Sequence, residues 1–305
     1  MGVVFLGTSD FAATILARLA EDERYRPIFA LTRPDRPRGR GRQLASPPVA
    51  EAARALGLTL AQPASVNDPE TVAAIDSVRP DAVVVCAYGA LIKEPLLSAH
   101  ELLNVHPSLL PRWRGAAPIE RAIMVGDELT GVSIMRLTAG LDSGPVCLAE
   151  HEPIGSGDSY GSLASRLAEL GARLLLRVLD AKTDGHPPAF VEQDERRVTY
   201  AEKIESRERT LDPARPAVEL ERVVRALHPH IGARVALEDG TLLGVHEAAL
   251  APAVPGGALG VLAREQRLLL VCAEGALALR VVQPPGGRAM PAEAYLRGHG
   301  LAVRR

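Results

Sequence analysis

The first half of the chain alternates short apolar runs with segments in which apolar residues recur every three or four positions. Continuous apolar runs are typical of strands covered on both faces, and the periodic segments are typical of amphipathic helices. The predicted strands are Val3–Leu6, Ile28–Leu31, Leu58–Ala61, Ala82–Tyr88, Leu102–His106, Gly131–Thr138 and Pro145–Glu150. The predicted helices among them are Phe11–Leu19, Pro48–Leu56 and Pro69–Val78. This alternation predicts an α/β domain with a doubly wound parallel sheet.

The pattern changes in the last third of the chain. Leucines and a valine spaced by three or four positions predict an amphipathic helix over Ser162–Leu179, and the polar segment Val191–Thr210 resembles a linker. A helix over Ala217–Leu227 is then followed by strand-sized runs separated by Gly and Pro. These runs are Ala233–Leu237, Leu242–Val245, Leu268–Cys272 and Leu277–Val282. Short strands at this spacing predict a small β-barrel as a second domain.

Composition and charge exclude several classes of protein. The 305 residues are 47% hydrophobic and 24% charged, which is ordinary for a globular protein and argues against disorder. The net charge of −2 means that contact with a polyanion must depend on a local patch. Residues 205–305 carry 13 basic and 11 acidic side chains, so the second domain is mildly basic.

The expected location is the cytoplasm. The three cysteines lie far apart in apolar runs without a C-x-x-C pair, which excludes a disulfide framework and a cysteine zinc site. No apolar stretch approaches the ~20 residues of a membrane-spanning helix, and no basic segment typical of a signal peptide precedes the first apolar run. We therefore expect neither a membrane partner nor a metal.

Three polar side chains form the candidate active site. Asn104 and His106 alternate along one predicted strand and therefore share a face near its carboxyl end, which Pro107 terminates. Ligands bind at this edge of an open α/β sheet. The carboxylate of Asp142 lies in a glycine-flanked turn after the strand Gly131–Thr138, which we expect to end at the same edge. An amide, an imidazole and a carboxylate together suit acyl transfer. The alternative is that all three only cap strand ends and turns.

Two other motifs compete with this interpretation. Gly157-Asp158-Ser159-Tyr160-Gly161 fits the nucleophile-elbow pattern of serine hydrolases, but glycines separate the serine from the preceding strand. A Ser-Asp-Ser cluster before a helical run is also typical of a helix N-terminus. Asp142-Ser143-Gly144 resembles one aspartic-protease triplet, yet that chemistry needs two, and a second is absent from the sequence.

A basic segment follows the second predicted strand. Thr32–Leu44 carries five arginines and one aspartate, and it is rich in Pro and Gly, so neither helix nor strand is expected there. Several arginines in a loop at the edge of the candidate site suit phosphate contacts with a polynucleotide. The alternative is an ordinary solvated loop.

Several segments of the chain resemble a known family. They are Gly7–Ala12, Pro34–Gly41, Asn104–Ile119, Gly140–Gly144 and Thr199–Ile204. Together they resemble the 10-formyltetrahydrofolate-dependent formyltransferase family, and the methionyl-tRNA formyltransferases within it. The stretch from Asn104 to Pro111 is common to formyltransferases that use this folate, whereas the arginine segment and Tyr200-Ala201-Glu202-Lys203 narrow the match to the tRNA enzymes.

The resemblance implies a fold, a reaction and roles for residues. It implies a Rossmann-like catalytic domain over 1–189, a linker over 190–207 and an OB-like, tRNA-contacting domain over 208–305. Asn104, His106 and Asp142 would be catalytic, the first two stabilising the oxyanion and Asp142 orienting His106 and helping to pass a proton to N10 of the folate. The folate would contact Tyr88, Gly89, Leu91, Ile92, Ser108, Leu109, Leu110 and Pro111. Arg36, Arg38, Arg40 and Arg42 would bind the acceptor stem of initiator methionyl-tRNA, which receives the formyl group for translation initiation.

Two departures from the family pattern keep an alternative open. Pro107 after His106 is usual in glycinamide-ribonucleotide relatives, and Leu227–Gly232 lacks an expected tryptophan-and-proline segment. The alternative is a formyltransferase that uses the same folate but acts on a small amine such as a nucleotide-sugar. A tRNA-binding module with an inactive site is the third hypothesis, and the intact Asn, His and Asp set argues against it.

Overall fold

The computed structural model describes residues 1–38 and 43–298, which form two compact units. The first unit consists of Met1–Pro118, Leu129–Pro153 and Ala164–Ala201. The second consists of Ile119–Glu128, Ile154–Leu163 and the chain from Glu202 onward. Two short segments from earlier in the chain, Ile119–Glu128 and Ile154–Leu163, thus belong to the second unit.

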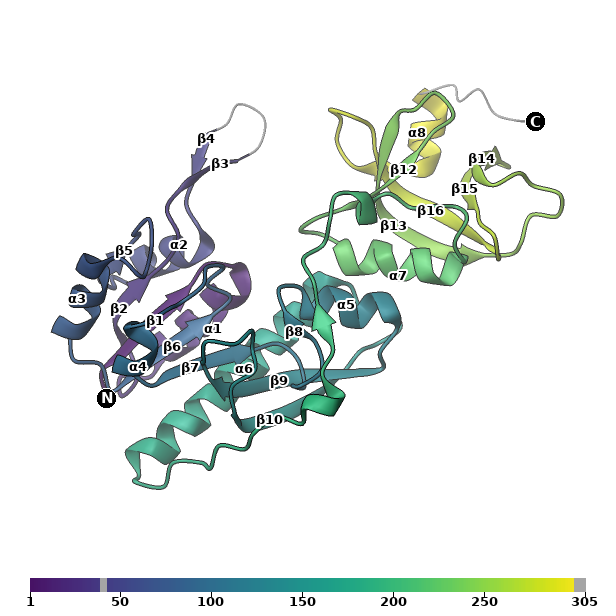
Figure 1. The fold of residues 1–305 in the computed structure, drawn as a ribbon. Helices are drawn as coiled ribbons and strands as arrows, with labels where there is room; N and C mark the ends of the chain where they lie inside the picture. The colour runs from purple at the N-terminus through teal and green to yellow at the C-terminus, as the bar shows by residue number, and fades with distance from the viewer. Residues whose placement is uncertain (39–42, 299–305) are drawn as a thin grey trace. The chain divides into compact units, whose positions relative to one another are not determined.

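A seven-stranded sheet forms the centre of the first unit, with strand order β10-β9-β7-β6-β1-β2-β5 (Figure 1). The strands are β1 (Val3–Gly7), β2 (Pro27–Leu31), β5 (Leu60–Ala61), β6 (Ala82–Cys86), β7 (Leu102–His106), β9 (Leu129–Arg136) and β10 (Val146–Pro153). The five strands from β7 to β5 are parallel, as predicted. The strand β9 is antiparallel to both of its neighbours, so the sheet is mixed.

Helices cover both faces of this sheet. They are α1 (Asp10–Glu21), α2 (Pro48–Ala55), α3 (Pro69–Ser77), α4 (Leu96–Ala99) and α6 (Tyr160–Thr183). On one face α6 packs so closely that a Cβ on Gly171 would lie 2.9 Å from Val105. On the other face Ile75 of α3 and Leu96 of α4 join the core around Leu102. Within the described residues, none of the helices combines the length and apolarity required to span a membrane.

The arginine segment does form strands, contrary to the expectation from its Pro and Gly content. β3 (Arg36–Arg38) and β4 (Gln43–Ala45) pair as an antiparallel hairpin, with Arg36 opposite Ala45. A proline can occupy a two-stranded ribbon because one edge of each strand has no partner to bond. Arg40 and Arg42 lie outside the described residues.

The segment predicted as a linker packs against the first unit as far as Ala201. It contains a short helix η1 (Glu195–Arg197) and the strand β11 (Tyr200–Ala201), which pairs with β8 (Arg114–Gly115). Val191 also forms an isolated bridge with Val146 at the start of β10. The return of the chain along β8 brings this segment next to the candidate site.

An antiparallel sheet of six strands forms the core of the second unit. Its strands are β12 (Ala233–Ala236), β13 (Leu242–Ala251), β14 (Gly260–Arg264), β15 (Arg267–Val271), β16 (Ala276–Gln283) and β17 (Met290–Pro291). The helices α7 (Ala217–Leu227) and α8 (Ala292–Gly298) complete its hydrophobic core. Because the described edge strands β12 and β14 do not pair, the predicted barrel is a curled half-barrel sheet.

Polar contacts attach α5 (Pro118–Val125) and the segment before α6 to the second unit. Arg121 of α5 forms an ion pair with Glu208 in the short helix η2 (Arg207–Arg209). Arg225 of α7 donates to the carbonyl of Asp158 at 2.7 Å. These contacts explain why two segments from earlier in the chain cluster with the C-terminal part.

Histidines gather in the second unit at the segment that departs from the family pattern. The Nδ1 atom of His228 is buried without a hydrogen-bond partner among the described residues, and its ring meets that of His246 edge-on at 5.8 Å. His230 stacks on Tyr160 and its Nε2 lies 2.8 Å from Glu120. Burial lowers the pKa of His228, and the nearby His246 lowers it further.

Protonation of His228 should destabilise the protein in mild acid. The unfolded chain takes up this proton at the ordinary histidine pKa of about 6.5, and the folded chain takes it up only at lower pH. Stability is therefore complete above that pKa and declines as the pH falls below it, by at most about 1.4 kcal/mol per pH unit for one proton. Urea unfolding at pH 7.5 and 5.5 should show a smaller loss for His228→Phe than for the wild type. The same change at the exposed His186 should leave the loss unaltered, and equal losses in all three proteins would contradict this account.

Candidate active site

The strand β7 places two polar side chains together on one face of the sheet. Asn104 and His106 lie on the same side as Leu102, and their relative exposures are only 7% and 4%. The sequence therefore predicted both the strand and the shared face. Buried polar groups are costly unless they are paired, so the partners of these two side chains define the site.

The imidazole of His106 is held in one tautomer. Its Nε2 lies 2.9 Å from the backbone carbonyl of Trp113, and a carbonyl can only accept a hydrogen bond, so Nε2 carries a proton. Its Nδ1 faces Oδ2 of Asp142 at 3.8 Å. In the neutral ring Nδ1 thus carries the lone pair, and it lies on the side of the Asp142 carboxylate.

Asp142 reaches His106 by a different route from the one expected. Because β9 is antiparallel to β7, His106 pairs with Ser133, and Arg136 at the carboxyl end of β9 pairs with Leu103. The strand preceding Asp142 therefore ends away from His106 and not at the same edge. The following loop must return along the sheet to bring its carboxylate to the imidazole. His106 and Asp142 do lie close together, with 3.8 Å between Nδ1 and Oδ2, but the expectation that both strands end at the same edge is wrong.

The carboxylate of Asp142 is fixed by a backbone donor. The N–H of Gly115 donates to Oδ2 of Asp142 at 2.8 Å. Gly115 has φ of +118°, and a Cβ there would lie 2.8 Å from the carbonyl of Ala201, so only glycine fits. This close approach explains why the strand pair β8–β11 belongs to the site.

Gln193 is a site residue that the sequence did not indicate. Its Nε2 donates to the carbonyls of Asp142 and Gly144 at 2.8 and 2.7 Å. Its Oε1 accepts from Nε of Arg114, which is 3% exposed and also pairs with Glu195. The amide orientation is thus set by its partners, and Gln193 holds both ends of the turn that carries Asp142. A glutamine in a polar segment gives no sequence signal for this role.

The side chain of Asn104 remains available for a ligand. It receives no hydrogen bond from any residue that the structure describes, although it is largely buried beside His106. The amide therefore presents donors at the carboxyl end of β7. A buried amide of this kind suits the stabilisation of a developing oxyanion.

The residues expected to contact folate fall into two loops. Ser108 is fully buried and donates to the carbonyl of Arg112, while the N–H of Leu110 donates to Oγ of Ser133. Ile92 is buried in the core, and Leu91 is 65% exposed. The remaining members, Leu109, Pro111, Tyr88 and Gly89, lie in the same two loops. The structure thus places one loop directly after β7 and the other after β6.

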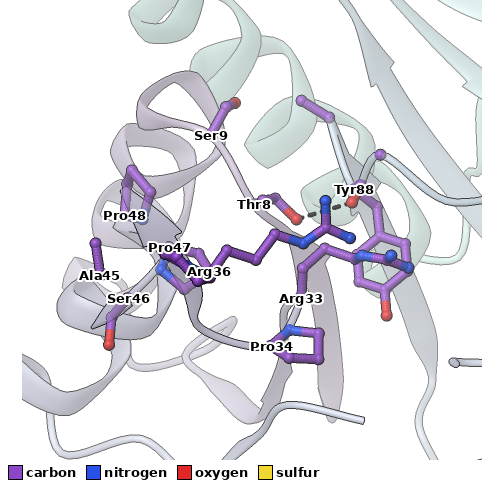
Figure 2. A pocket seen from close by; sticks show the side chains of 13 residues that line it. Thr8, Ser9, Arg33, Pro34, Arg36, Ala45, Ser46, Pro47, Pro48 and Tyr88 are labelled. Atoms are coloured by element: carbon purple, nitrogen blue, oxygen red, sulfur yellow. Dashed lines mark hydrogen bonds between the residues drawn. The ribbon is translucent and has the colours of Figure 1, made fainter. Parts of the chain in front are cut away.

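A pocket of about 370 Å³ opens at the carboxyl ends of β1, β2 and β6 (Figure 2). Its walls include Tyr88 and Gly89 from the expected folate set and Arg36 from the expected tRNA set. Among the described residues, the other members of the expected folate set do not line it. Arg38 is the last residue of β3.

Ser159 caps the helix α6 and does not form a nucleophile elbow. Its Oγ accepts from the N–H of Ser162 at 3.3 Å, and Oγ of Ser162 accepts from the N–H of Ser159 at 3.1 Å. This reciprocal pairing satisfies donors at the helix N-terminus. The capping interpretation of this motif is therefore confirmed.

Both parts of the chain are similar to known proteins. A model of the formyl transferase family matches residues 1–179, and a model of the formyl transferase C-terminal domain matches residues 203–300. The chain therefore belongs to the formyl transferase family. It is 43% identical over 310 residues to the methionyl-tRNA formyltransferase of Methylococcus capsulatus, covering 100% of this chain and 99% of that protein. It is also 43% identical over 306 residues to that of Xanthomonas campestris, covering 97% of each.

Solved structures with low sequence identity share the fold. HypX from Aquifex aeolicus in complex with tetrahydrofolic acid matches with a TM-score of 0.67 at 18% identity, over 99% of this chain and 48% of that one. An N-formyltransferase from Helicobacter canadensis, in complex with folinic acid and dTDP-3-aminofucose, matches with a TM-score of 0.62 at 12% identity, over 92% and 98%. The predicted two-part architecture is confirmed by these likenesses.

Replacing Gln193 by glutamate should slow formyl transfer without unfolding the protein. The carboxylate keeps the length of the side chain and the contact with Arg114, but it cannot donate to the carbonyls of Asp142 and Gly144. We expect kcat to fall about 10-fold to 100-fold, because small displacements of a catalytic group have effects of this size, with KM values nearly unchanged.

Two controls separate positioning from general stability. Glu195→Gln alters the other partner of Arg114 without touching the turn, and it should keep nearly full activity. In an Asp142→Ala background the effect of Gln193→Glu should disappear, because the two changes disturb one unit. Additive losses of activity would contradict a role that acts through Asp142.

Proposed function

We propose that this protein transfers the formyl group of 10-formyltetrahydrofolate to the α-amino group of methionyl-initiator tRNA in the cytoplasm. The observation that carries the proposal is the match of both parts of the chain, over nearly its whole length, to methionyl-tRNA formyltransferases. The juxtaposition of Asn104, His106 and Asp142 supports it, because these groups suit acyl transfer to an amine. The folate supplies the formyl carbon and leaves through N10.

The neutral amine of the aminoacyl ester attacks the formyl carbon. The new bond joins that carbon to the amine nitrogen, the bond to N10 breaks, and one proton moves from the amine to N10. Asn104 donates a hydrogen bond to the formyl oxygen as negative charge develops on it. His106 accepts the amine proton on Nδ1 and returns it to N10, while Asp142 stabilises the protonated ring.

This assignment refines the expectation from the sequence. With Nε2 occupied by the carbonyl of Trp113, a neutral His106 has no free N–H to offer an oxyanion. Only the protonated ring could donate through Nδ1, beside Asp142. We therefore assign oxyanion stabilisation mainly to Asn104 and proton transfer mainly to His106.

The folate contacts proposed here are Ser108, Leu109, Leu110 and Pro111 with Tyr88, Gly89, Leu91 and Ile92. The side chain of Asn67 fixes the loop that carries Leu91, because it donates to the carbonyl of Leu91 and accepts from the N–H of Lys93. An exposed leucine on a fixed loop suits contact with a flat aromatic ring. The amide of Asn104, which is 7% exposed and has no hydrogen bond to the described residues, suits the formyl end of the same molecule.

The decisive test measures formyl transfer from 10-formyltetrahydrofolate to charged initiator tRNA, with small amines such as an amino-sugar nucleotide as parallel acceptors. The wild type should formylate the tRNA and not the amino-sugar nucleotide. His106→Ala and Asp142→Asn should each lose about 10²-fold to 10³-fold in kcat, as removal of a preorganised catalytic group does. His186→Ala on the surface should be unaffected. Transfer to the small amine alone would show that the tRNA is not the acceptor. Full turnover by either site variant would contradict the catalytic assignment of that residue.

We also propose that Arg36, Arg38, Arg40 and Arg42 bind phosphates of the tRNA. Replacing all four by glutamine should weaken tRNA binding and make it less dependent on salt. Each phosphate contact that is lost lowers the number of counterions released when the tRNA binds. The slope of log K against log salt should fall by roughly 0.7 to 0.9 per contact. Binding measured between about 50 and 200 mM salt tests this. An unchanged slope would mean that the segment is an ordinary solvated loop without phosphate contacts.

A further inference from the structure

The pocket at the ends of β1, β2 and β6 has the properties of an anion site. It is lined by the turn after β1, by residues at the base of the β3–β4 hairpin, by the start of α2 and by the turn after β6 (Figure 2). Gly7 permits this turn to lie close to β6, since a Cβ there would be 3.0 Å from the carbonyl of Cys86. Oγ1 of Thr8 then donates to the carbonyl of Tyr88, which joins two walls of the pocket.

Two arginines in the pocket carry charge that the protein does not neutralise. Neither Arg33 nor Arg36 has a side-chain hydrogen bond or an ion pair among the described residues, and Figure 2 shows both side chains extending toward Tyr88. The acidic residue between them is turned elsewhere: Asp35 accepts from Ser46 at 3.0 Å and from Gln62 at 2.6 Å. The positive charge is therefore available to a ligand.

Two helix N-termini add to this positive potential. Ser9, the N-cap of α1, and Pro47, the N-cap of α2, both line the pocket. A helix N-terminus carries a partial positive charge and free N–H groups, and it favours anions.

The hydroxyl of Tyr88 is an independent sign of a missing partner. Tyr88 is 3% exposed, lines the pocket, and its OH has no hydrogen-bond partner within the described part of the chain. A buried hydroxyl without a partner is costly, so such groups usually meet a ligand or a water. Burial raises the pKa of Tyr88, which keeps the hydroxyl protonated and able to donate.

We propose that this pocket binds the phosphate of the 3′-terminal nucleotide of the aminoacyl-tRNA, an inference that rests on the proposed function. Val85 of β6 pairs with Asn104 of β7, and β1 is the next strand, so the pocket lies about two strand spacings, or ~10 Å, from Asn104. The aminoacyl ester is attached to the terminal ribose, and the phosphate on the 5′ side of that ribose is the nearest one to the amine. Holding this phosphate fixes the reach of the amine toward Asn104 and His106.

Minimal acceptors test this assignment directly. The wild-type protein should formylate 3′-O-methionyl-adenosine 5′-phosphate with a kcat/KM at least about tenfold above that for 3′-O-methionyl-adenosine, as expected for charge-assisted hydrogen bonds. Arg33→Met should abolish this preference, and Tyr88→Phe should reduce it. Arg177→Met, on α6 and outside the pocket, should preserve it.

The outcomes separate this inference from the proposed function. Equal kcat/KM for the two acceptors in the wild type would overturn the phosphate site while formylation of charged tRNA in the same assay still stood. A rise in KM for the folate in Arg33→Met, with the phosphate preference retained, would assign the pocket to the folate and overturn the inference as well. Loss of all transfer to charged tRNA in the wild type would instead refute the proposed function.

Discussion

The site depends on the two-sided fixing of one buried imidazole. The carbonyl of Trp113 accepts a hydrogen bond from Nε2 of His106, so Nδ1 carries the lone pair of the neutral ring. Among the described residues, the carboxylate that faces Nδ1 is that of Asp142. Because the ring is 4% exposed, little of it is open to water. The surroundings of His106 thus depend on the position of the loop that carries Asp142.

The protein holds the loop from two directions. Gly115 donates to the carboxylate of Asp142, and Gln193 donates to two backbone carbonyls of the same turn. Both donors depend on the segment that returns after α6, since Thr199 accepts from the N–H of Trp113 through its hydroxyl and β11 pairs with β8. The same returning segment therefore fixes the carboxylate and the carbonyl on opposite sides of His106. Its polar composition, which resembles a linker, reflects these hydrogen bonds.

The sequence predicted what local patterns determine. The bounds of β7 were predicted to the residue and those of α7 approximately, since an apolar run ended by Pro107 and a helical period leave few alternatives. The direction of β9 and the role of Gln193 could not be predicted, because both depend on contacts between segments far apart in the chain. The hairpin β3–β4 was missed for another reason. Its composition disfavours a central strand, but a two-stranded ribbon needs fewer backbone donors.

Electrostatics in this protein is local. A net charge of −2 gives no overall attraction to a polyanion. Many arginines form ion pairs within the protein, such as Arg114 with Glu195 and Arg121 with Glu208. After β2 the opposite holds, because Asp35 bonds to the neutral Ser46 and Gln62, and the nearby Arg33 has no ion pair among the described residues. A field made in this way is short-ranged under physiological salt. Such a field acts on an anion that is already at the pocket, and it gives little attraction at longer range.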